Sequence, residues 1–331
     1  MAGEFDLIKR FFTHEPFGRW RSQGVGDDCA LIDTAGEHLS VTMDQMAVGT
    51  HFLPDALPEN VGYKALAVNL SDLAASGAEP RCFFLGLALP EENIPWLEGF
   101  SKGLMDLARA HDCALLGGDM TRTPLVGYRH APVTISITAM GAVPENLSRT
   151  RSGAVPGDDV WVSGTLGDAY AALMIRQDNW AGHIQDQDYL FSRMDRPEPR
   201  VALGLALRGI ATACADVSDG LLADLGHILE RSNVSADIDW ESVPLSNALQ
   251  AYPVAWQQKA ALTGGDDYEL VFTASPEERV RIEAVSRALS LRLSRIGVIS
   301  SPRSGDNLNV RDVRGRPIFF QGGFDHFAAD S

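Results

Sequence analysis

Hydrophobic and polar residues follow two different periods along this chain, and the two periods alternate from one end to the other. Between residues 92 and 111, apolar side chains recur every three to four positions, which is the spacing of one helix face. Residues 133–138, VTISIT, alternate between branched apolar and small hydroxyl side chains. This alternation predicts a strand with one buried and one wetter face. The pattern therefore predicts an α/β or α+β chain with mixed sheets and argues against an all-helical one.

Several further segments show the same change of period. Residues 113–116, CALL, form a short apolar run that we expect Gly117 and Gly118 to end, with a loop after them. Residues 158–164, DDVWVSG, predict another strand, and a helix is expected from about residue 166. Residues 214–232, CADVSDGLLADLGHILERS, predict a strand, a turn and a helix with a leucine-rich buried face.

The chain has 331 residues, which is longer than a single hydrophobic core usually becomes, so two domains are expected. The stretch near 143–157 is rich in glycine, proline and charge, as linkers are. We therefore predict an N-terminal domain over residues 1–145 and a C-terminal domain over residues 146–331.

Charge and cysteine usage narrow the class of protein. The chain carries 28 Lys plus Arg against 44 Asp plus Glu, a net charge of −16, so nucleic acid and anionic membranes are not expected partners. The four cysteines form no C-x-x-C pair, which indicates free thiols in a reducing compartment. The first residues lack a signal-peptide pattern, and no apolar stretch is long enough to span a bilayer. The cytoplasm is the expected location.

Aspartates recur in glycine-rich or strand-adjacent motifs, and we expect most of them to end a strand or open a helix. The motifs are Gly26-Asp27-Asp28, Asp44 in VTMD, Asp72 in NLSD, Gly117-Gly118-Asp119, Asp216-Val217-Ser218-Asp219 and Gly265-Asp266-Asp267. If these positions converge, their carboxylates would need bound cations, and an all-oxygen set suits magnesium together with substrate phosphates. Taken singly, each motif is better explained by a turn or a helix N-cap than by a metal ligand, and VPGDDVWV at 155–162 reads as a plain turn into a strand. The six occurrences together favour metal binding.

The common nucleotide-binding loops are absent from the sequence: there is no G-x-x-x-x-G-K-[ST], no protein-kinase glycine loop and no G-x-G-x-x-G after a strand. Phosphates would then be held by metal, by backbone amides at glycine-rich turns or helix N-termini, and by arginine. Arg149 and Arg151 are the candidate arginines, with solvated linker charges as the alternative. No arrangement typical of covalent catalysis is recognisable.

In this order, the motifs resemble the thiamine-monophosphate kinases, members of the superfamily that includes aminoimidazole ribonucleotide synthetase and selenophosphate synthetase. The resemblance covers nearly the whole chain. It is carried by GEFDLIKRFF, GVGDDCALI, VTMDQMAVGTHF, YKALAVNLSDLAASGAEP, LLGGDMTR, TRSGAVPGD, DVSDGLLADLGHI, TGGDDYELVFT and GGFDHF. It implies transfer of the γ-phosphoryl group of ATP to thiamine monophosphate, giving thiamine diphosphate, in a homodimer that uses several Mg²⁺ ions. An N-terminal domain for ATP, metal and dimer contacts would be completed by the C-terminal domain.

The resemblance also implies which residues bind each group. The expected metal ligands are Asp28, Thr42, Met43, Asp44, Asp72, Asp119, Asp216 and Asp219. ATP would contact Gly118, Asp119, Arg151 and Ser218, and the thiamine substrate would contact His51, Asp266 and Phe324. No catalytic residue is expected beyond the metal cluster, because a phosphate acceptor needs no general base.

Three positions depart from the family pattern. Met43 stands where a threonine is common, so a hydroxyl ligand is lost there and Thr42 is the possible replacement. Asp266 is one methylene shorter than the usual glutamate, and Phe324 replaces a Trp or Tyr, keeping a stacking face without a polar group.

Three other functions fit parts of the pattern: ATP-dependent amide or acyl-phosphate activation, metal-dependent phosphate hydrolysis, and calcium binding without catalysis. The sequence has no D-x-[DN]-x-[DN]-G loop to support the last of these.

Overall fold

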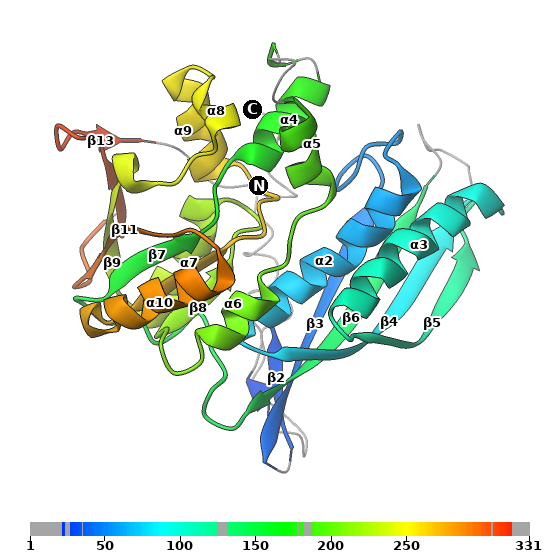
Figure 1. Ribbon diagram of the computed structural model, residues 1–331, viewed down its shortest axis with the longest axis horizontal. Helices are drawn as coiled ribbons and strands as arrows, with labels where there is room; N and C mark the ends of the chain where they lie inside the picture. The colour runs from blue at the N-terminus through cyan, green and yellow to red at the C-terminus, as the bar shows by residue number, and fades with distance from the viewer. Residues whose placement is uncertain are drawn as a thin grey trace.

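The computed structural model of the chain describes residues 22–23, 27–34, 36–124, 132–177, 179–181, 187–305 and 307–319. Within these ranges the chain forms two mixed β-sheets with helices packed against them (Figure 1). This arrangement confirms the predicted α/β class with mixed sheets. Among the described residues, no helix is both long and apolar enough to cross a membrane.

The N-terminal sheet has six strands in the order β1-β2-β3-β6-β4-β5. Their bounds are β1 Ser22–Gln23, β2 Ala30–Asp33, β3 Glu37–Ala47, β4 Glu79–Leu89, β5 Ala114–Arg122 and β6 Thr134–Pro144. The β4–β5 pair is parallel, whereas β3 and β4 both pair antiparallel with β6. Helices α2 (Pro58–Ser76) and α3 (Ile94–Ala110) lie over one face of this sheet (Figure 1).

Helices α2 and α3 approach each other closely at two glycines. A Cβ atom on Gly62 would overlap the carbonyl oxygen of Phe100, and one on Gly103 would overlap that of Glu59. Only glycine lets two helix backbones come this near. The contact matters because α2 is buried along most of its length and supplies residues to the site described below.

The C-terminal sheet has seven strands in the order β13-β12-β9-β11-β7-β10-β8. Their bounds are β7 Asp159–Ser163, β8 Ala213–Asp216, β9 Ser235–Asp239, β10 Leu270–Ala274, β11 Leu293–Ser300, β12 Leu308–Arg311 and β13 Pro317–Ile318. The helices of this half are α4 Asp168–Arg176, α5 Gln187–Asp195, α6 Val201–Ala206, α7 Leu221–Ser232, α8 Asn247–Gln250, α9 Val254–Thr263 and α10 Arg279–Leu289. Two short 3₁₀ helices, η1 Trp240–Ser242 and η2 Pro276–Glu278, complete it.

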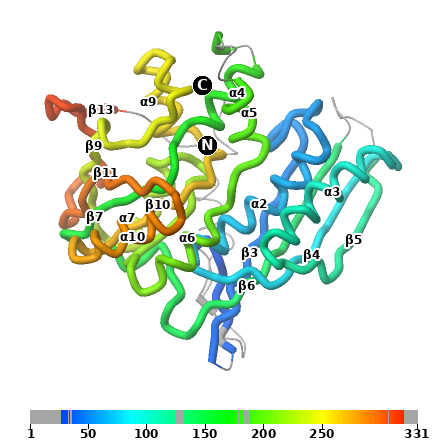
Figure 2. Tube along the Cα trace, viewed as in Figure 1, coloured from blue at the N-terminus to red at the C-terminus, as the bar shows by residue number. Residues whose placement is uncertain are grey.

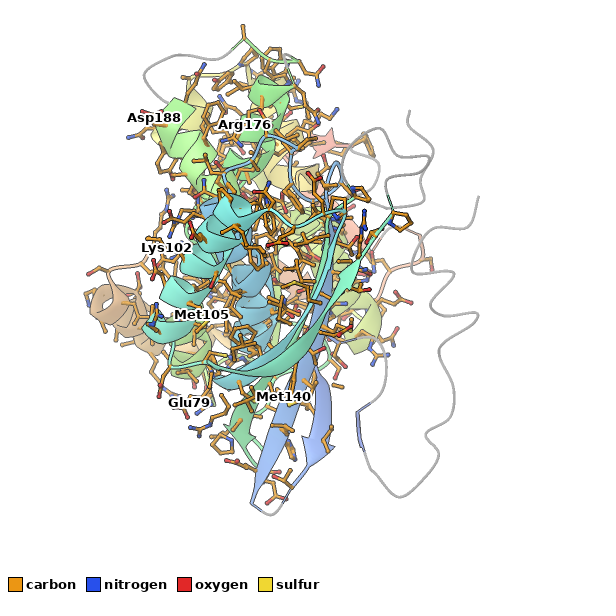
Figure 3. All side chains as sticks on the ribbon, turned by 90° about the vertical axis from the view of Figure 1, so that its right-hand side faces the viewer. Glu79, Lys102, Met105, Met140, Arg176 and Asp188 are labelled. Atoms are coloured by element: carbon orange, nitrogen blue, oxygen red, sulfur yellow. The ribbon has the colours of Figure 1, made fainter. Side chains whose placement is uncertain are left out.

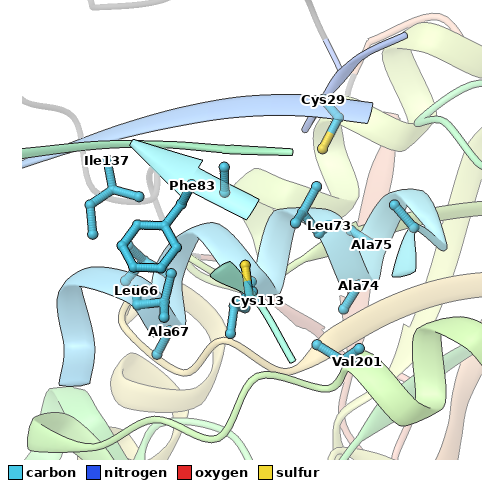
Figure 4. Packing of buried hydrophobic residues seen from close by; sticks show 14 of the residues in the cluster. Cys29, Leu66, Ala67, Leu73, Ala74, Ala75, Phe83, Cys113, Ile137 and Val201 are labelled. Atoms are coloured by element: carbon cyan, nitrogen blue, oxygen red, sulfur yellow. The ribbon is translucent and has the colours of Figure 1, made fainter. Parts of the chain in front are cut away.

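One hydrophobic core extends across both halves of the chain. Along β10, Leu270 and Phe272 face the cluster that contains α2, whereas Val271 faces the cluster under α7. Val201 of α6 belongs to the first cluster, and Figure 4 shows it beside Ala74 of α2. The Cα trace in Figure 2 shows the same arrangement, with α6 running between α2 and the second sheet. Helix α2 is therefore enclosed by elements from both halves.

Most predicted elements appear where the sequence placed them, with one correction. The predicted helix within 92–111 is α3, and the strand at 133–138 lies in β6 with its apolar residues buried. The predicted loop after Gly117 is wrong, because β5 continues through both glycines to Arg122. The reason is close packing, since a Cβ on Gly118 would overlap the carbonyl oxygen of Leu85 on β4. Gly157 does form the expected turn before β7.

Candidate active site

Three aspartates from three separate elements meet beside α2. Asp28 precedes β2, Asp72 lies on α2 and Asp216 ends β8. One carboxylate oxygen from each lies within 4.8 Å of the other two. Carboxylates this close repel one another unless protons or cations neutralise them. We call these three residues the carboxylate cluster, and it draws on both halves of the chain.

The surroundings of the cluster raise the pKa values of its carboxyl groups, so that each of them binds a proton more tightly than it would in water. Burial raises the pKa of Asp28, and burial together with Asp44 and Asp216 raises that of Asp72 well above its usual range. Burial, reinforced by the charge of Asp28, raises the pKa of Asp216 to about 8. A divalent cation would replace these protons, so the donor set fits a hard ion such as Mg²⁺.

Strand β3 brings a second pair of oxygen-bearing side chains to the same place. The Thr42 hydroxyl donates a hydrogen bond to Asp72 Oδ2 at 2.5 Å. Asp44 also interacts with Asp72, and burial raises its pKa to about 6. Met43, between them, projects from the other face of the strand and is 63% exposed. Its side chain therefore does not reach the cluster, and position 43 could offer only backbone oxygen to a metal.

Arg151 is tied to the cluster. Its Nε and Nη2 atoms donate to Asp28 Oδ1 at 3.1 and 2.6 Å, and its backbone N–H donates to Asp27 Oδ1 at 2.7 Å. Arg149 is buried instead at the C-terminal end of α2, where it donates to the carbonyl oxygens of Ala74 and Gly204. The alternative that these arginines are solvated linker charges is wrong for both of them.

The loop between β8 and α7 carries the remaining predicted ligands of the C-terminal half. The Asp224 carboxylate accepts hydrogen bonds from the backbone N–H groups of Ser218 and Asp219, both at 3.1 Å. This orders the turn before α7 and places Asp219 and Ser218 three and two residues beyond Asp216 along it. The Asp216 carboxylate is itself held by the Ser71 hydroxyl of α2, which donates to Oδ2 at 2.6 Å.

A second polar group lies where the resemblance places the thiamine substrate. Asp266 Oδ2 accepts a hydrogen bond from Lys64 Nζ at 2.7 Å, and Asp266 Oδ1 accepts one from the Tyr268 hydroxyl at 3.1 Å. His51 Nδ1 accepts from the backbone N–H of Ala47 at 3.1 Å, so a neutral His51 ring carries its proton on Nε2. Burial, reinforced by the charges of Asp266, Asp44 and Asp216, raises the pKa of the Tyr268 hydroxyl well above its usual range.

Asp119 lies on the other side of the N-terminal sheet. It pairs with Gly86 of β4, Gly86 pairs with Ser136 of β6, and Ser136 pairs with Gln45 of β3. Residues paired across a sheet point to the same face, and neighbours along a strand point to opposite faces. Asp119 therefore shares the face of Gln45, whereas Asp44 faces α2. Within one chain the structure does not bring Asp119 to the cluster, and Gly118 lies beside it on β5.

The expectation that the aspartates sit at element junctions holds only in part. Asp28 and Asp216 do so, but Asp44, Asp72 and Asp119 lie inside β3, α2 and β5. Their polar side chains are tolerated there because they face the site or, for Asp119, the side of the sheet that no described helix or strand covers. The predicted aromatic residue Phe324 lies outside the described residues.

Sequence reasoning missed four residues that hold the others in place, namely Lys64, Ser71, Asp224 and Tyr268. One signal was available, because Lys64 is directly followed by the apolar run Ala65-Leu66-Ala67-Val68 of a buried helix. A lysine in such a place needs a partner.

Comparison with protein families gives two matches. The AIR synthase related protein N-terminal domain matches residues 26–143, and the corresponding C-terminal domain matches residues 155–306. Together they cover most of the chain. A curated thiamine-monophosphate kinase from Salmonella typhimurium is 42% identical over 332 residues, covering 99% of both proteins.

Solved structures give the same result. The thiamine-monophosphate kinase from Stenotrophomonas maltophilia K279a matches with a TM-score of 0.77 and 46% identity, covering 87% of this chain and 90% of that one. The structure of AaThiL complexed with AMPPCP and TMP matches with a TM-score of 0.81 and 30% identity, covering 98% and 97%. The likeness thus extends from sequence to fold over both halves.

Proposed function

Because the chain belongs to the AIR synthase related protein family and, within it, to the thiamine-monophosphate kinases, we propose that it transfers the terminal phosphoryl group of ATP to thiamine monophosphate. The product is thiamine diphosphate. The relative that binds AMPPCP, an analogue of ATP, together with TMP supports both substrates.

The observation that carries this proposal is the carboxylate cluster. Its oxygens lie within 4.8 Å of one another although they come from both halves of the chain. Two polyanionic substrates meet in such a reaction, and an acidic site can accept them only with cations between protein and phosphate. Oxygen-only donors that are buried and mutually repelling fit that need.

The cations that fit best are several Mg²⁺ ions. Asp28, Asp44, Asp72 and Asp216 would hold them, with Thr42, Asp219 and a backbone oxygen at Met43 as further candidates. When bound, Mg²⁺ neutralises phosphate charge as the phosphoryl group moves. Arg151 holds Asp28, and Ser71 holds Asp216, so these two residues orient carboxylate oxygens toward the ions.

The acceptor explains why the reaction needs no general base. A phosphate monoester has a second pKa of about 6 and is largely a dianion at neutral pH, so no proton has to be removed. Gly118, Asp119, Arg151 and Ser218 are the proposed contacts for ATP, and His51, Asp266 and Phe324 those for the thiamine substrate. The chain's contribution is to position the two phosphates and to exclude unproductive arrangements.

We further propose a homodimer that forms on the uncovered face of the N-terminal sheet. Met43 is 63% and Phe84 is 39% exposed on this face. Strand β5, at the edge of the sheet, is exposed along its whole length. An apolar sheet face of this kind is usually covered by a partner. A second copy there would bring its own Asp119 and Gly118 toward the first chain's site.

The four buried or half-buried free cysteines support a reducing cytoplasmic location.

Incubation with ATP, Mg²⁺ and thiamine monophosphate, followed by chromatography, tests the proposed reaction. We expect thiamine diphosphate and ADP in equal amounts, and no product with unphosphorylated thiamine as acceptor. Release of inorganic phosphate without thiamine diphosphate would instead indicate a phosphohydrolase and overturn the proposal.

A further inference from the structure

Helix α2 carries one lysine in its buried part. Lys64 is 5% exposed, whereas the other described lysines, Lys102 and Lys259, are exposed, and Figure 3 shows Lys102 on the outer side of α3. A buried ammonium group is costly unless it is paired and hydrogen-bonded. Lys64 has both kinds of partner, since Nζ donates to the Asp266 carboxylate at 2.7 Å and to the His51 carbonyl oxygen at 3.4 Å. Lys64 thus touches two of the three residues proposed to bind the thiamine substrate, His51 and Asp266.

Asp266 is fixed from two sides. Lys64 occupies Oδ2 and the Tyr268 hydroxyl occupies Oδ1, while the Asp266 side chain remains 34% exposed. The carboxylate is therefore fixed by its two protein partners and is still accessible to a ligand. Each carboxylate oxygen has a second lone pair, so a ligand can hydrogen-bond without displacing either partner.

The backbone of this loop is fixed as well. Asp266 and Tyr268 have positive φ angles of 70° and 50°, which non-glycine residues rarely adopt. Hydrogen bonds from their N–H groups to the carbonyl oxygens of Ser218 and Val217 hold this conformation, at 2.9 and 2.8 Å. Strained loops held in this way are typical of ligand-binding sites. The backbone hydrogen bonds that hold this loop come from the C-terminal half of the chain, whereas Lys64, which holds the Asp266 side chain, comes from the N-terminal half.

We propose that Lys64 is a positioning residue for the thiamine substrate: from α2 in the N-terminal half it sets the orientation of Asp266 in the C-terminal half, and so joins the two halves of the substrate site. The inference rests on the proposed function. The Lys64–Asp266 pair is neutral as a unit, so Asp266 acts toward the substrate as an oriented hydrogen-bond acceptor rather than as an isolated negative charge. Tyr268 shares the task, because its hydroxyl holds the other carboxylate oxygen of Asp266.

The test is steady-state kinetics of the full-length Lys64→Met variant with thiamine monophosphate and ATP varied separately. Loss of one partner of a charged hydrogen bond should raise KM for thiamine monophosphate by about tenfold or more, with KM for ATP changed less than about twofold. Lys102→Met is the matched control, because Lys102 forms only exposed ion pairs with Glu59 and Asp106, and it should leave both constants unchanged.

Two more variants distinguish a positioning role of Lys64 from a role in the stability of the fold alone. Tyr268→Phe should raise the same KM by a smaller factor. The double variant Lys64→Met/Asp266→Asn removes both charges, leaves no unpaired ion, and should be no worse than Asp266→Asn alone, because Lys64 acts through Asp266.

Three results would each overturn the inference. They are an unchanged KM of Lys64→Met for thiamine monophosphate, an equal rise in its KM for ATP, and a double variant whose KM rises by the product of the two single effects. If Lys64→Met does not fold, the KM values of the double variant and of Tyr268→Phe for thiamine monophosphate test the inference instead. A wild-type protein that forms no thiamine diphosphate would overturn the proposed function together with this inference, whereas an active wild type with an unaffected Lys64→Met overturns the inference alone.

Discussion

At the scale of single residues, the carboxylates of the site repel one another unless protons or a cation neutralise them. The pKa of Asp216 is raised to about 8 and that of Asp44 to about 6, chiefly by burial, so both groups bind protons more tightly in the folded chain than in the unfolded one. Stability from this source is fully present below the unfolded pKa near 4 and is lost as the pH rises through the folded values.

We therefore predict that the metal-free protein becomes less stable between pH 5 and pH 8, and that added Mg²⁺ stabilises it more at pH 8 than at pH 5. One pKa unit corresponds to about 1.4 kcal/mol, and each kcal/mol shifts Tm by roughly 2–4 °C in a domain of this size. Calorimetry with a chelator or with Mg²⁺ at both pH values measures this. Asp216→Asn should flatten the metal-free slope, and a metal-free Tm that rises toward pH 8 would contradict the explanation.

The sequence identified the cluster's aspartates through their motifs, but not the contacts that hold them. Asp28 and Asp216 stand beside glycine or at a strand end, and such positions are recognisable from spacing alone. Lys64 could not be identified in this way, because its partner Asp266 is about two hundred residues away along the chain. Pairing over such a separation depends on how the two sheets are packed, which no local pattern encodes.

At the scale of elements, helix α2 and its contact with α3 hold the site in place. Gly103→Ala would push α3 against the carbonyl oxygen of Glu59 on α2. Because both clashing groups belong to backbone, we expect a loss of about 1–3 kcal/mol or more in the free energy of unfolding, measured by urea denaturation. Gly226→Ala is the control: it lies within α7, has no atom near the added methyl group, and should be neutral or stabilising by up to about 1 kcal/mol.

If Gly103→Ala retained full stability, the two helices would not be in close contact as described.

Element types were largely predictable, since periodicity identified α3, β6, β7 and α7. Strand β5 was not predicted correctly, because glycine normally ends an apolar run, and only the close approach to β4 explains why the strand continues.

At the scale of the whole molecule, the position of Asp119 is the main argument for the proposed homodimer. It lies on the sheet face opposite to Asp44, so a site that uses both residues must take Asp119 from a partner. The sequence indicated Asp119 as a ligand but gave no sign of which face of β5 it occupies.

This arrangement predicts complementation between inactive subunits. Asp72→Asn and Asp119→Asn should each lower kcat by about 10²-fold or more, because each removes a charge from the metal site. After subunit exchange, a mixed dimer would contain one intact site, so an equal mixture should regain about a quarter of wild-type turnover. A mixture of Asp72→Asn with Asp216→Asn should regain none, since both residues belong to the same subunit's site. Failure of the first mixture to recover would place Asp119 in its own chain's site or outside it.

The shared core has a consequence for how the protein is made. The N-terminal half leaves the ribosome first. Until the second sheet has been synthesised, the face of α2 that later contacts α6 and β8 has nothing to cover it. Asp72 then has no Asp216 beside it, and Lys64 has no Asp266. The nascent chain therefore cannot assemble the cluster from its first half, and a cation held by all three carboxylates could bind only after the second half has been made.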